Sequence, residues 1–241
     1  MISKSDIKLI RSLERKRERD ETGLFIAEGE KIVNELINSG WIVEKIFYKD
    51  DIGDELMSRI SRLSSPSPVL AVVKQPLISE PLSPVKGKRY LALDSVKDPG
   101  NMGTIIRIAD WYGIEGIFCS EDCVDIYNPK VVQSSMGSIF RMKIKYTSLV
   151  KLIEESRNLT DVYGTFLNGD NIYEISFPES AIIIMGSESF GISSDVGNLT
   201  DKRISIPTFN KKGAESLNVA IATAIVCSEF RRSFGVKSQK V

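Results

Sequence analysis

Three polar segments, each following an apolar run of strand type, hold most of the side chains that could do chemistry. The first, DSVKDPGNMGTIIR (94–107), opens a helical pattern, and strand ends of this kind bind ligands in open α/β sheets. Its two aspartates, Asp94 and Asp98, are candidates either for a metal site in a phosphoester hydrolase or for helix caps. Gly103 admits a close backbone approach, and Arg107 follows about one helical turn later, within reach of the loop.

The second segment, AIIIMGSESFG (181–191), has two glycines five residues apart after an apolar strand. This spacing imitates a phosphate-binding loop, but no lysine follows Gly191 and the chain contains no GxGxxG. Both absences argue against Walker-type and Rossmann nucleotide sites. What remains is Glu188 in a glycine-lined backbone at the end of a strand.

The third segment follows ISIP (204–207) and contains Lys211 and Lys212. Ser216 and Asn218 stand at the head of the last helical pattern, and the simplest interpretation is that Ser216 caps that helix. Three strand-end loops in one sheet converge when the strands are parallel, so these segments are candidates for a common site.

The composition narrows the chemistry. The 241 residues include no histidine, which excludes a Ser-His-Asp triad, an imidazole base and histidine-ligated zinc. The three cysteines lack CxxC spacing, so neither a disulfide framework nor a structural zinc is expected. There is no signal peptide and no apolar run of about 18 residues to span a membrane. The sequence therefore predicts a cytoplasmic protein without a metal and without a membrane partner.

The elements that must position these segments form two groups. Helical patterns at 5–19 and after Gly29, with strands at 44–48 and 69–74, predict a small α+β module. The prolines Pro76, Pro81 and Pro84 then interrupt regular structure and indicate a linker. Further on, helical patterns alternate with continuous apolar strands, which predicts a parallel sheet covered on both faces. These patterns lie at 104–113, 148–158 and from Glu215 onward, and the strands at 90–94, 116–119, 161–167, 181–186 and 203–207.

The N-terminal helical pattern is basic although the whole chain is neutral, with 32 cations and 32 acids. A cationic helix face neutralises phosphates of a nucleic acid, and the alternative is a solvated face with i,i+4 ion pairs. The cations of this run are Lys4, Lys8, Arg11, Arg15, Lys16, Arg17 and Arg19.

Taken together, the three segments resemble the ordered motifs of the SpoU-type RNA ribose 2′-O-methyltransferases of the SPOUT superfamily. Asn101, Gly103 and Arg107 fit the first motif, Gly186, Glu188 and Gly191 the second, and Pro207, Ser216, Leu217 and Asn218 the third. Residues 123–142 resemble the segment that follows the first motif in this family. The N-terminal part resembles the family's substrate-binding domain, which is similar to a ribosomal protein, through Lys16, Arg19, Gly23, Phe25 and the pair Glu28-Gly29.

The resemblance implies a parallel α/β domain with a deep C-terminal trefoil knot, joined to an α+β domain that binds RNA. It divides the chain into residues 1–75, a linker at 76–88, and a catalytic domain at 89–241. It implies a homodimer that uses S-adenosylmethionine to methylate a ribose 2′-hydroxyl of structured RNA. A substrate-binding domain of this type favours 23S rRNA, and the alternatives are tRNA or a catalytically silent ribosome-assembly protein.

The motif match also assigns roles to residues. Arg107, Glu188, Ser216 and Asn218 are the catalytic candidates, and backbone at Gly186, Ile206 and Leu217 would contact the cofactor. The candidates for RNA binding are Asn101, Arg15, Lys16, Arg19 and Lys211. A guanidinium group keeps its proton at physiological pH, so either the site lowers the pKa of the motif-one arginine strongly or another group accepts the hydroxyl proton. The chain departs from the family pattern at Gln133, Lys143, Thr208, Phe209, Lys211 and Lys212, which bears on the RNA target.

Overall fold

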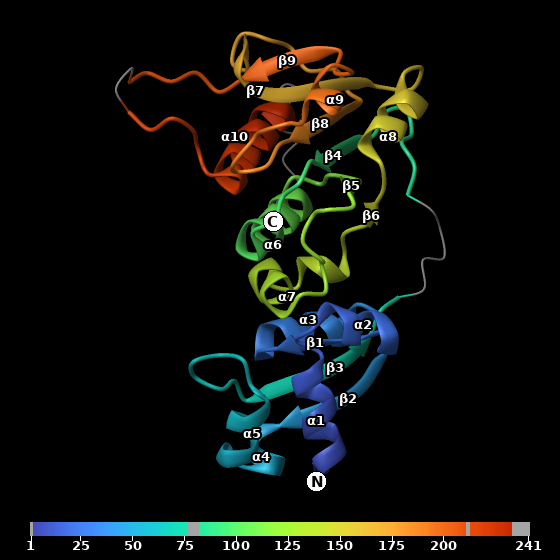
Figure 1. Ribbon diagram of the computed structural model, residues 1–241, viewed down its shortest axis with the longest axis vertical. Coiled ribbons are helices and arrows are strands. Elements are labelled where there is room, and N and C mark those ends of the chain that lie inside the picture. Colours follow the sequence, from blue (N-terminus) through green and yellow to red (C-terminus); the bar gives the residue numbers. More distant parts are fainter. Residues whose placement is uncertain (1, 77–81, 211–212, 233–241) are drawn as a thin grey trace.

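The computed structural model describes residues 2–76, 82–210 and 213–232, which contain two sheets of different construction (Figure 1). The smaller sheet has three antiparallel strands in the order β1-β3-β2. The larger has six parallel strands in the order β6-β5-β4-β8-β7-β9. The predicted combination of a parallel α/β domain with a small α+β N-terminal domain is confirmed.

The N-terminal domain packs short helices around its antiparallel sheet. Phe25 and Ile26 lie on opposite faces of β1, and each joins a different buried cluster. Strand β1 was not predicted as a separate element, and neither were the two short helices after β2. The elements are α1 (Lys4–Ser12), α2 (Lys16–Thr22), β1 (Leu24–Glu28), α3 (Glu30–Asn38), β2 (Val43–Tyr48), α4 (Lys49–Ile52), α5 (Asp54–Ile60) and β3 (Val69–Lys74).

The predicted single helix over 5–19 is wrong, because the chain breaks after Ser12 and Arg15 adopts an extended backbone with φ −83° and ψ 131°. Ile10 and Arg19 are both buried. In one continuous helix, nine residues at about 100° each would place them on opposite faces. The break turns α2 so that both side chains reach the interior.

The C-terminal domain alternates strands and helices along the chain. Alternate residues of the central strand β4 join different clusters: Leu91 and Leu93 pack with α6 and α10, whereas Tyr90 and Ala92 pack with α8 and α9. The strands are therefore apolar throughout, as a sheet covered on both faces requires. The elements are β4 (Arg89–Leu93), α6 (Pro99–Trp111), β5 (Gly116–Cys119), α7 (Pro129–Ser135), η1 (Ser138–Phe140), β6 (Ile144–Tyr146), α8 (Leu149–Ser156), β7 (Asp161–Asn171), β8 (Ala181–Met185), α9 (Ser194–Gly197), β9 (Lys202–Ser205) and α10 (Val219–Arg232).

The two domains contact each other through α7 and the segment before it, which lie against β1 and α3 in Figure 1. The rings of Phe25 and Tyr127 are 4.9 Å apart between centroids, and a single buried cluster extends across the boundary. Arg19, which is 1% exposed, donates from Nη2 to Oδ2 of Asp125 at 2.6 Å. The predicted linker lies partly at 77–81, outside the described residues.

Candidate active site

The carboxyl ends of β4, β8 and β9 lie at one edge of the parallel sheet, and the three polar segments begin there. Asp94 connects the first two segments, because its Oδ2 accepts hydrogen bonds from the backbone nitrogen and the hydroxyl of Ser193 at 2.7 and 2.8 Å. Asp98 caps α6 by accepting from the nitrogen of Asn101 at 2.8 Å. Both aspartates therefore have structural partners, and no metal-binding cluster of three side chains occurs in the described parts of the chain.

The loop after β4 contains a strained residue held by side-chain hydrogen bonds. Ser95 has a φ of 59°, which is uncommon outside glycine. Its hydroxyl donates to Asp122 at 2.6 Å, and its backbone nitrogen donates to the Ser120 hydroxyl. Hydrogen bonds from Ser120 and Ser95 also lower the pKa of Asp122. The start of the first segment is thus fixed by the neighbouring strand end.

Asn101 joins all three segments through its side chain. Its Nδ2 donates to Oε1 of Glu188 at 2.8 Å, and its Oδ1 accepts from Nδ2 of Asn218 at 2.9 Å. An ionised carboxylate only accepts hydrogen bonds, so the amide nitrogen of Asn101 must face Glu188. Its oxygen must then face Asn218, which turns the oxygen of that residue toward the backbone of α10. Each amide orientation follows from the one before it.

Asn218 is also the residue that caps the last helix, so the interpretation that gave this role to Ser216 is wrong. Oδ1 of Asn218 accepts from the nitrogens of Ala220 at 2.9 Å and Ile221 at 3.2 Å, and α10 begins at Val219 rather than near Glu215. The side chain of Ser216 is exposed and has no hydrogen bond to a described residue.

The glycines of the first two motifs allow close backbone packing. A methyl group on Gly186 would lie 2.2 Å from the carbonyl carbon of Gly191 and the nitrogen of Ile192, so only glycine fits where β8 meets the loop. The predicted close approach at Gly103 is made by α7, because a methyl group there would lie 2.5 Å from Cβ of Ser134. Gly103 therefore serves helix packing.

The backbone at the three cofactor positions is free to bind a ligand. No hydrogen bond joins the backbone of Gly186, Ile206 or Leu217 to any residue that the structure describes. Unpaired amide and carbonyl groups at three neighbouring loops suit an uncharged adenosine and an amino-acid moiety. The site fits S-adenosylmethionine on this ground.

Arg107 lies on the exposed side of α6 and is not brought into the Asn101 network. It has no hydrogen bond or ion pair to a described residue, so the predicted contact with the loop is absent. Trp111, one turn further along the same helix, is 84% exposed. Arg107 is therefore an unpaired cation beside an exposed apolar side chain.

The predicted RNA-binding cations differ in their availability. The prediction that Arg19 binds RNA is wrong, because the side chain is buried at the domain interface. There its Nη1 donates to the carbonyls of Leu13 and Glu14. Arg15 and Lys16 are exposed but paired with Glu18 and Asp20. Lys211 lies outside the described residues.

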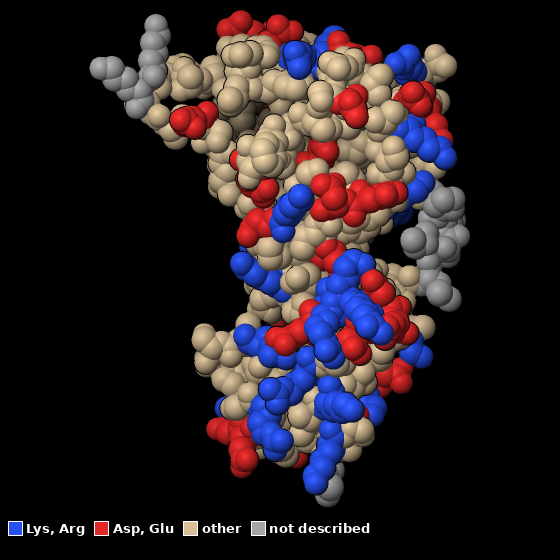
Figure 2. Space-filling view, in the orientation of Figure 1, with Lys and Arg blue, Asp and Glu red and all other residues tan. Residues whose placement is uncertain are grey.

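The unpaired cations of the basic run are on α1. Lys4, Lys8 and Arg11 have no acidic partner among the described residues, and with Arg15 they line a groove of about 410 Å³. Figure 2 shows Lys and Arg side chains gathered over the N-terminal domain. The acid spacing is the signal that would have separated the two groups, because Lys16 and Arg17 have an acid four residues later and these three do not.

The positions that depart from the family pattern are spread over the domain. Gln133 lines a cleft between the domains, and Lys143 forms an ion pair with Glu115 at 3.2 Å. The hydroxyl of Thr208 donates to the carbonyl of Asn210, and Phe209 is 93% exposed. Lys212, like Lys211, lies outside the described residues.

No helix in the described parts is long and apolar enough to cross a membrane.

Comparison with known proteins places this geometry among characterised folds. The model of the SpoU rRNA Methylase family matches residues 88–228, and that of the MRM3-like substrate binding domain matches residues 4–77. The 23S rRNA (guanosine(2553)-2′-O)-methyltransferase of Bacillus subtilis is 32% identical over 92% of this chain and 94% of its own length. The 23S rRNA (uridine(2479)-2′-O)-methyltransferase of Streptomyces viridochromogenes is 28% identical over 90% of this chain and 86% of its own.

Solved structures agree over nearly the whole chain. A TrmH-family protein from Porphyromonas gingivalis is 37% identical and superposes with a TM-score of 0.85, covering 96% of this chain and 99% of that one. An AdoMet-bound rRNA methyltransferase from Sinorhizobium meliloti is 31% identical with a TM-score of 0.85, covering 96% and 97%.

Proposed function

Because the chain belongs to the SpoU rRNA methylase family, we propose that it transfers a methyl group from S-adenosylmethionine to a ribose 2′-hydroxyl of 23S rRNA. The observation that carries this proposal is the network of Glu188, Asn101 and Asn218, which joins the three motifs at one edge of the sheet. The relatives that span both domains act on 23S rRNA, which favours this substrate over tRNA. One methylates a guanosine and the other a uridine, so the nucleotide that this chain methylates must be identified by mapping 2′-O-methyl groups in 23S rRNA.

S-adenosylmethionine supplies an electrophilic methyl group when bound. The free backbone of Gly186, Ile206 and Leu217 would hold it. These positions offer hydrogen-bond donors and acceptors without a charged side chain. Ser216 lies beside Leu217 and would orient either the cofactor or the ribose through its free hydroxyl.

Glu188 is the proposed acceptor of the 2′-hydroxyl proton. Its Oε1 accepts from Asn101, whereas its Oε2 has no partner among the described residues and is exposed to an incoming hydroxyl. Asn101 and Asn218 fix the orientation of the carboxylate, which is the arrangement that a general base requires. Oε2 would take the proton that O2′ loses when it is methylated, and the cofactor would leave as the neutral thioether once its bond to the methyl group is broken.

Arg107 would bind a phosphate of the substrate and stabilise the developing negative charge on O2′. A guanidinium group retains its proton, so this role suits it better than that of a base. Because Arg107 has no partner among the described residues, its donors are available to a phosphate. The groove with Lys4, Lys8, Arg11 and Arg15 would hold the RNA backbone at the N-terminal domain.

We also propose a homodimer that covers exposed apolar side chains near the site. Trp111 on α6 and Ile221 on the adjacent α10 are 84% and 54% exposed, and Phe190 in the second motif is 92% exposed. Large apolar side chains exposed on two packed helices are typical of an interaction surface. Sedimentation of the full chain tests the dimer, and Trp111→Glu should shift it to a monomer. The proposal also includes a trefoil knot at the C-terminus and a division of the chain into residues 1–75, a linker at 76–88 and a catalytic domain at 89–241. The protein would act in the cytoplasm, where ribosomal RNA is found.

The test is transfer of radiolabelled methyl groups from S-adenosylmethionine to RNA transcripts. We expect label in 23S rRNA and none in tRNA, and the product nucleotide should carry the methyl group on O2′. Label in tRNA alone would show that tRNA, and not 23S rRNA, is the substrate. Binding of S-adenosylmethionine and RNA without any transfer would instead indicate a silent ribosome-assembly protein.

A further inference from the structure

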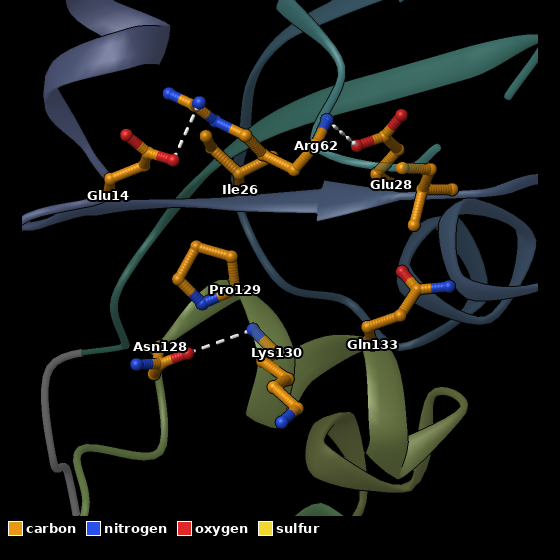
Figure 3. Close-up of a pocket in the computed structure, with 9 residues that line it drawn as sticks. Glu14, Ile26, Glu28, Arg62, Asn128, Pro129, Lys130 and Gln133 are labelled. Atoms are coloured by element: carbon orange, nitrogen blue, oxygen red, sulfur yellow. Dashed lines mark hydrogen bonds and ion pairs between the residues drawn. The ribbon is translucent and has the colours of Figure 1, made fainter. Parts of the chain in front are cut away.

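A cleft of about 410 Å³ lies between the two domains, apart from the cofactor positions (Figure 3). Its N-terminal wall includes Ile26, Glu28 and Arg62, and its C-terminal wall is the start of α7, with Pro129 and Lys130. The two walls therefore come from segments more than sixty residues apart. Apolar side chains and polar groups are mixed along them.

The acidic groups of the cleft already have partners. Glu28 is 5% exposed and accepts from the Ser61 hydroxyl and from the backbone nitrogen of Arg62 at 3.0 Å. Glu14 forms an ion pair with Arg62 at 2.6 Å. The ion pair neutralises Glu14, whereas the carboxylate of Glu28 is held by neutral hydrogen-bond donors.

The groups on α7 are free by contrast. The side chains of Lys130 and Gln133 have no hydrogen bond or ion pair to a described residue. Asn128 uses only its Oδ1, which accepts from the backbone nitrogen of Lys130 at 2.9 Å, so its Nδ2 is also available. In Figure 3 the Gln133 side chain points toward Glu28, and the Lys130 side chain points away from the wall that carries Ile26 and Arg62. Lys130 is therefore the cation of the cleft wall that has no acidic partner among the described residues.

Lys130 connects the cleft to the active site. A methyl group placed on Gly100 would lie 3.9 Å from Cε of Lys130, and Gly100 directly precedes Asn101. At the other end, Nη2 of Arg62 donates to the carbonyl of Arg11, which lines the α1 groove. The cleft thus lies between the unpaired cations of α1 and the loop that holds Asn101.

We propose that this cleft binds one unpaired nucleotide of the substrate RNA, flanking the nucleotide that is methylated. Lys130 holds its phosphate, and the amide of Gln133 reads an edge of its base. Ile26 and Pro129 supply the apolar contact that an unstacked base requires. The identity of the ligand rests on the proposed function, whereas the site itself rests on the free groups and their position.

The first test measures binding of a 23S rRNA transcript by Lys130→Gln at several salt concentrations. Loss of one charged hydrogen bond should weaken binding about tenfold. It should also reduce the slope of log K against log salt by about 0.7, which a purely structural change would not do. Lys151→Gln on α8 is the matched control, since Lys151 is 71% exposed and remote from the cleft, and it should resemble the wild type.

The second test places a photocrosslinker in the cleft. The native cysteines Cys119, Cys123 and Cys227 are all buried, so Gln133→Cys can be labelled selectively with a benzophenone maleimide. Irradiation should couple the label to the transcript, whereas the same label at Asn168→Cys on β7 should not. Coupling to a second copy of the chain, or equal behaviour of Lys130→Gln and Lys151→Gln, would overturn the proposal.

These readouts separate the cleft from the proposed function. If the protein methylates 23S rRNA and Lys130→Gln binds RNA like the wild type, the nucleotide site in the cleft is refuted and the proposed function stands. Salt-dependent binding and crosslinking at position 133 without methyl transfer would refute the enzymatic function and retain the RNA site.

Discussion

Asn101 donates a hydrogen bond to Glu188 at 2.8 Å across a separation of 87 residues. The same side chain accepts from Asn218, 117 residues away, so one amide connects the ends of three strands. The carboxylate proposed as the base is therefore held by Asn101, whose own orientation is fixed by Asn218. Changes to this amide should affect catalysis before they affect folding.

Asn101→Asp should reduce methyl transfer about a hundredfold or more, because it replaces the donor to Glu188 with a second carboxylate oxygen. S-adenosylmethionine binding, measured by calorimetry, should be retained. Asn168→Asp on β7 makes the same chemical change at an exposed position and should leave activity unaltered. Near-normal transfer by Asn101→Asp would refute the orienting role.

Arg107→Ala should lower methyl transfer about a hundredfold, since the developing charge on O2′ would lose a cationic partner. Arg107→Lys should restore part of the rate, because it keeps the charge but loses the planar fork. Single-turnover measurements separate this effect from RNA binding. Arg157→Ala, an exposed arginine after α8, is the control. Equal rates for the two alanine variants would remove Arg107 from the mechanism.

Replacing Lys4, Lys8 and Arg11 together with Gln should weaken RNA binding and flatten its salt dependence. Each lost phosphate contact reduces the slope of log K against log salt by about 0.7 to 0.9. The pair Lys16→Gln and Arg17→Gln should have a smaller effect, because both cations are already paired with acids. Filter binding at five salt concentrations provides the slopes, and equal slopes would contradict the assignment.

Arg19→Met should decrease the free energy of unfolding by about 3–5 kcal/mol, because it leaves Asp125 buried without its cation. The side chains of Arg19 and Asp125 are only 2% and 12% exposed, so solvent screens the pair little. Urea denaturation measures the change. Adding Asp125→Asn should recover part of the loss, and Arg17→Met on the surface of α2 should cost far less.

Tyr127 should make the domain interface sensitive to alkali. Burial, followed by the charge of Asp125, raises the pKa of Tyr127 from its usual value of 10.0 to about 12. A raised folded-state pKa contributes stability that is complete below pH 10 and is lost as pH rises toward 12. Tyr127→Phe should therefore lose less stability over this interval than the wild type. Urea denaturation of both proteins at pH 9 and 11 measures this difference. An equal loss of unfolding free energy in the wild type and in Tyr127→Phe would contradict the prediction.

The sequence predicted much of the fold because its signals are local. The strands at 116–119 and 181–185 are continuous apolar runs, and a sheet covered on both faces requires that pattern wherever it occurs. The motif residues Glu188 and Asn218 were identified for the same reason, since each stands beside an apolar run that fixes its place at a strand or helix end.

The positions that the sequence missed depend on partners far along the chain. Arg19 belongs to a basic run, and only its contact with Asp125, 106 residues away, shows that it is buried. Asn218 rather than Ser216 caps α10 because the helix begins at Val219, and the cap amide is oriented by a distant hydrogen bond to Asn101. The sequence by itself determined the element types, the order of the motifs and the family. The tertiary structure decided which polar groups are spent on one another and which stay free for a ligand, because that depends on desolvation and pairing between distant segments.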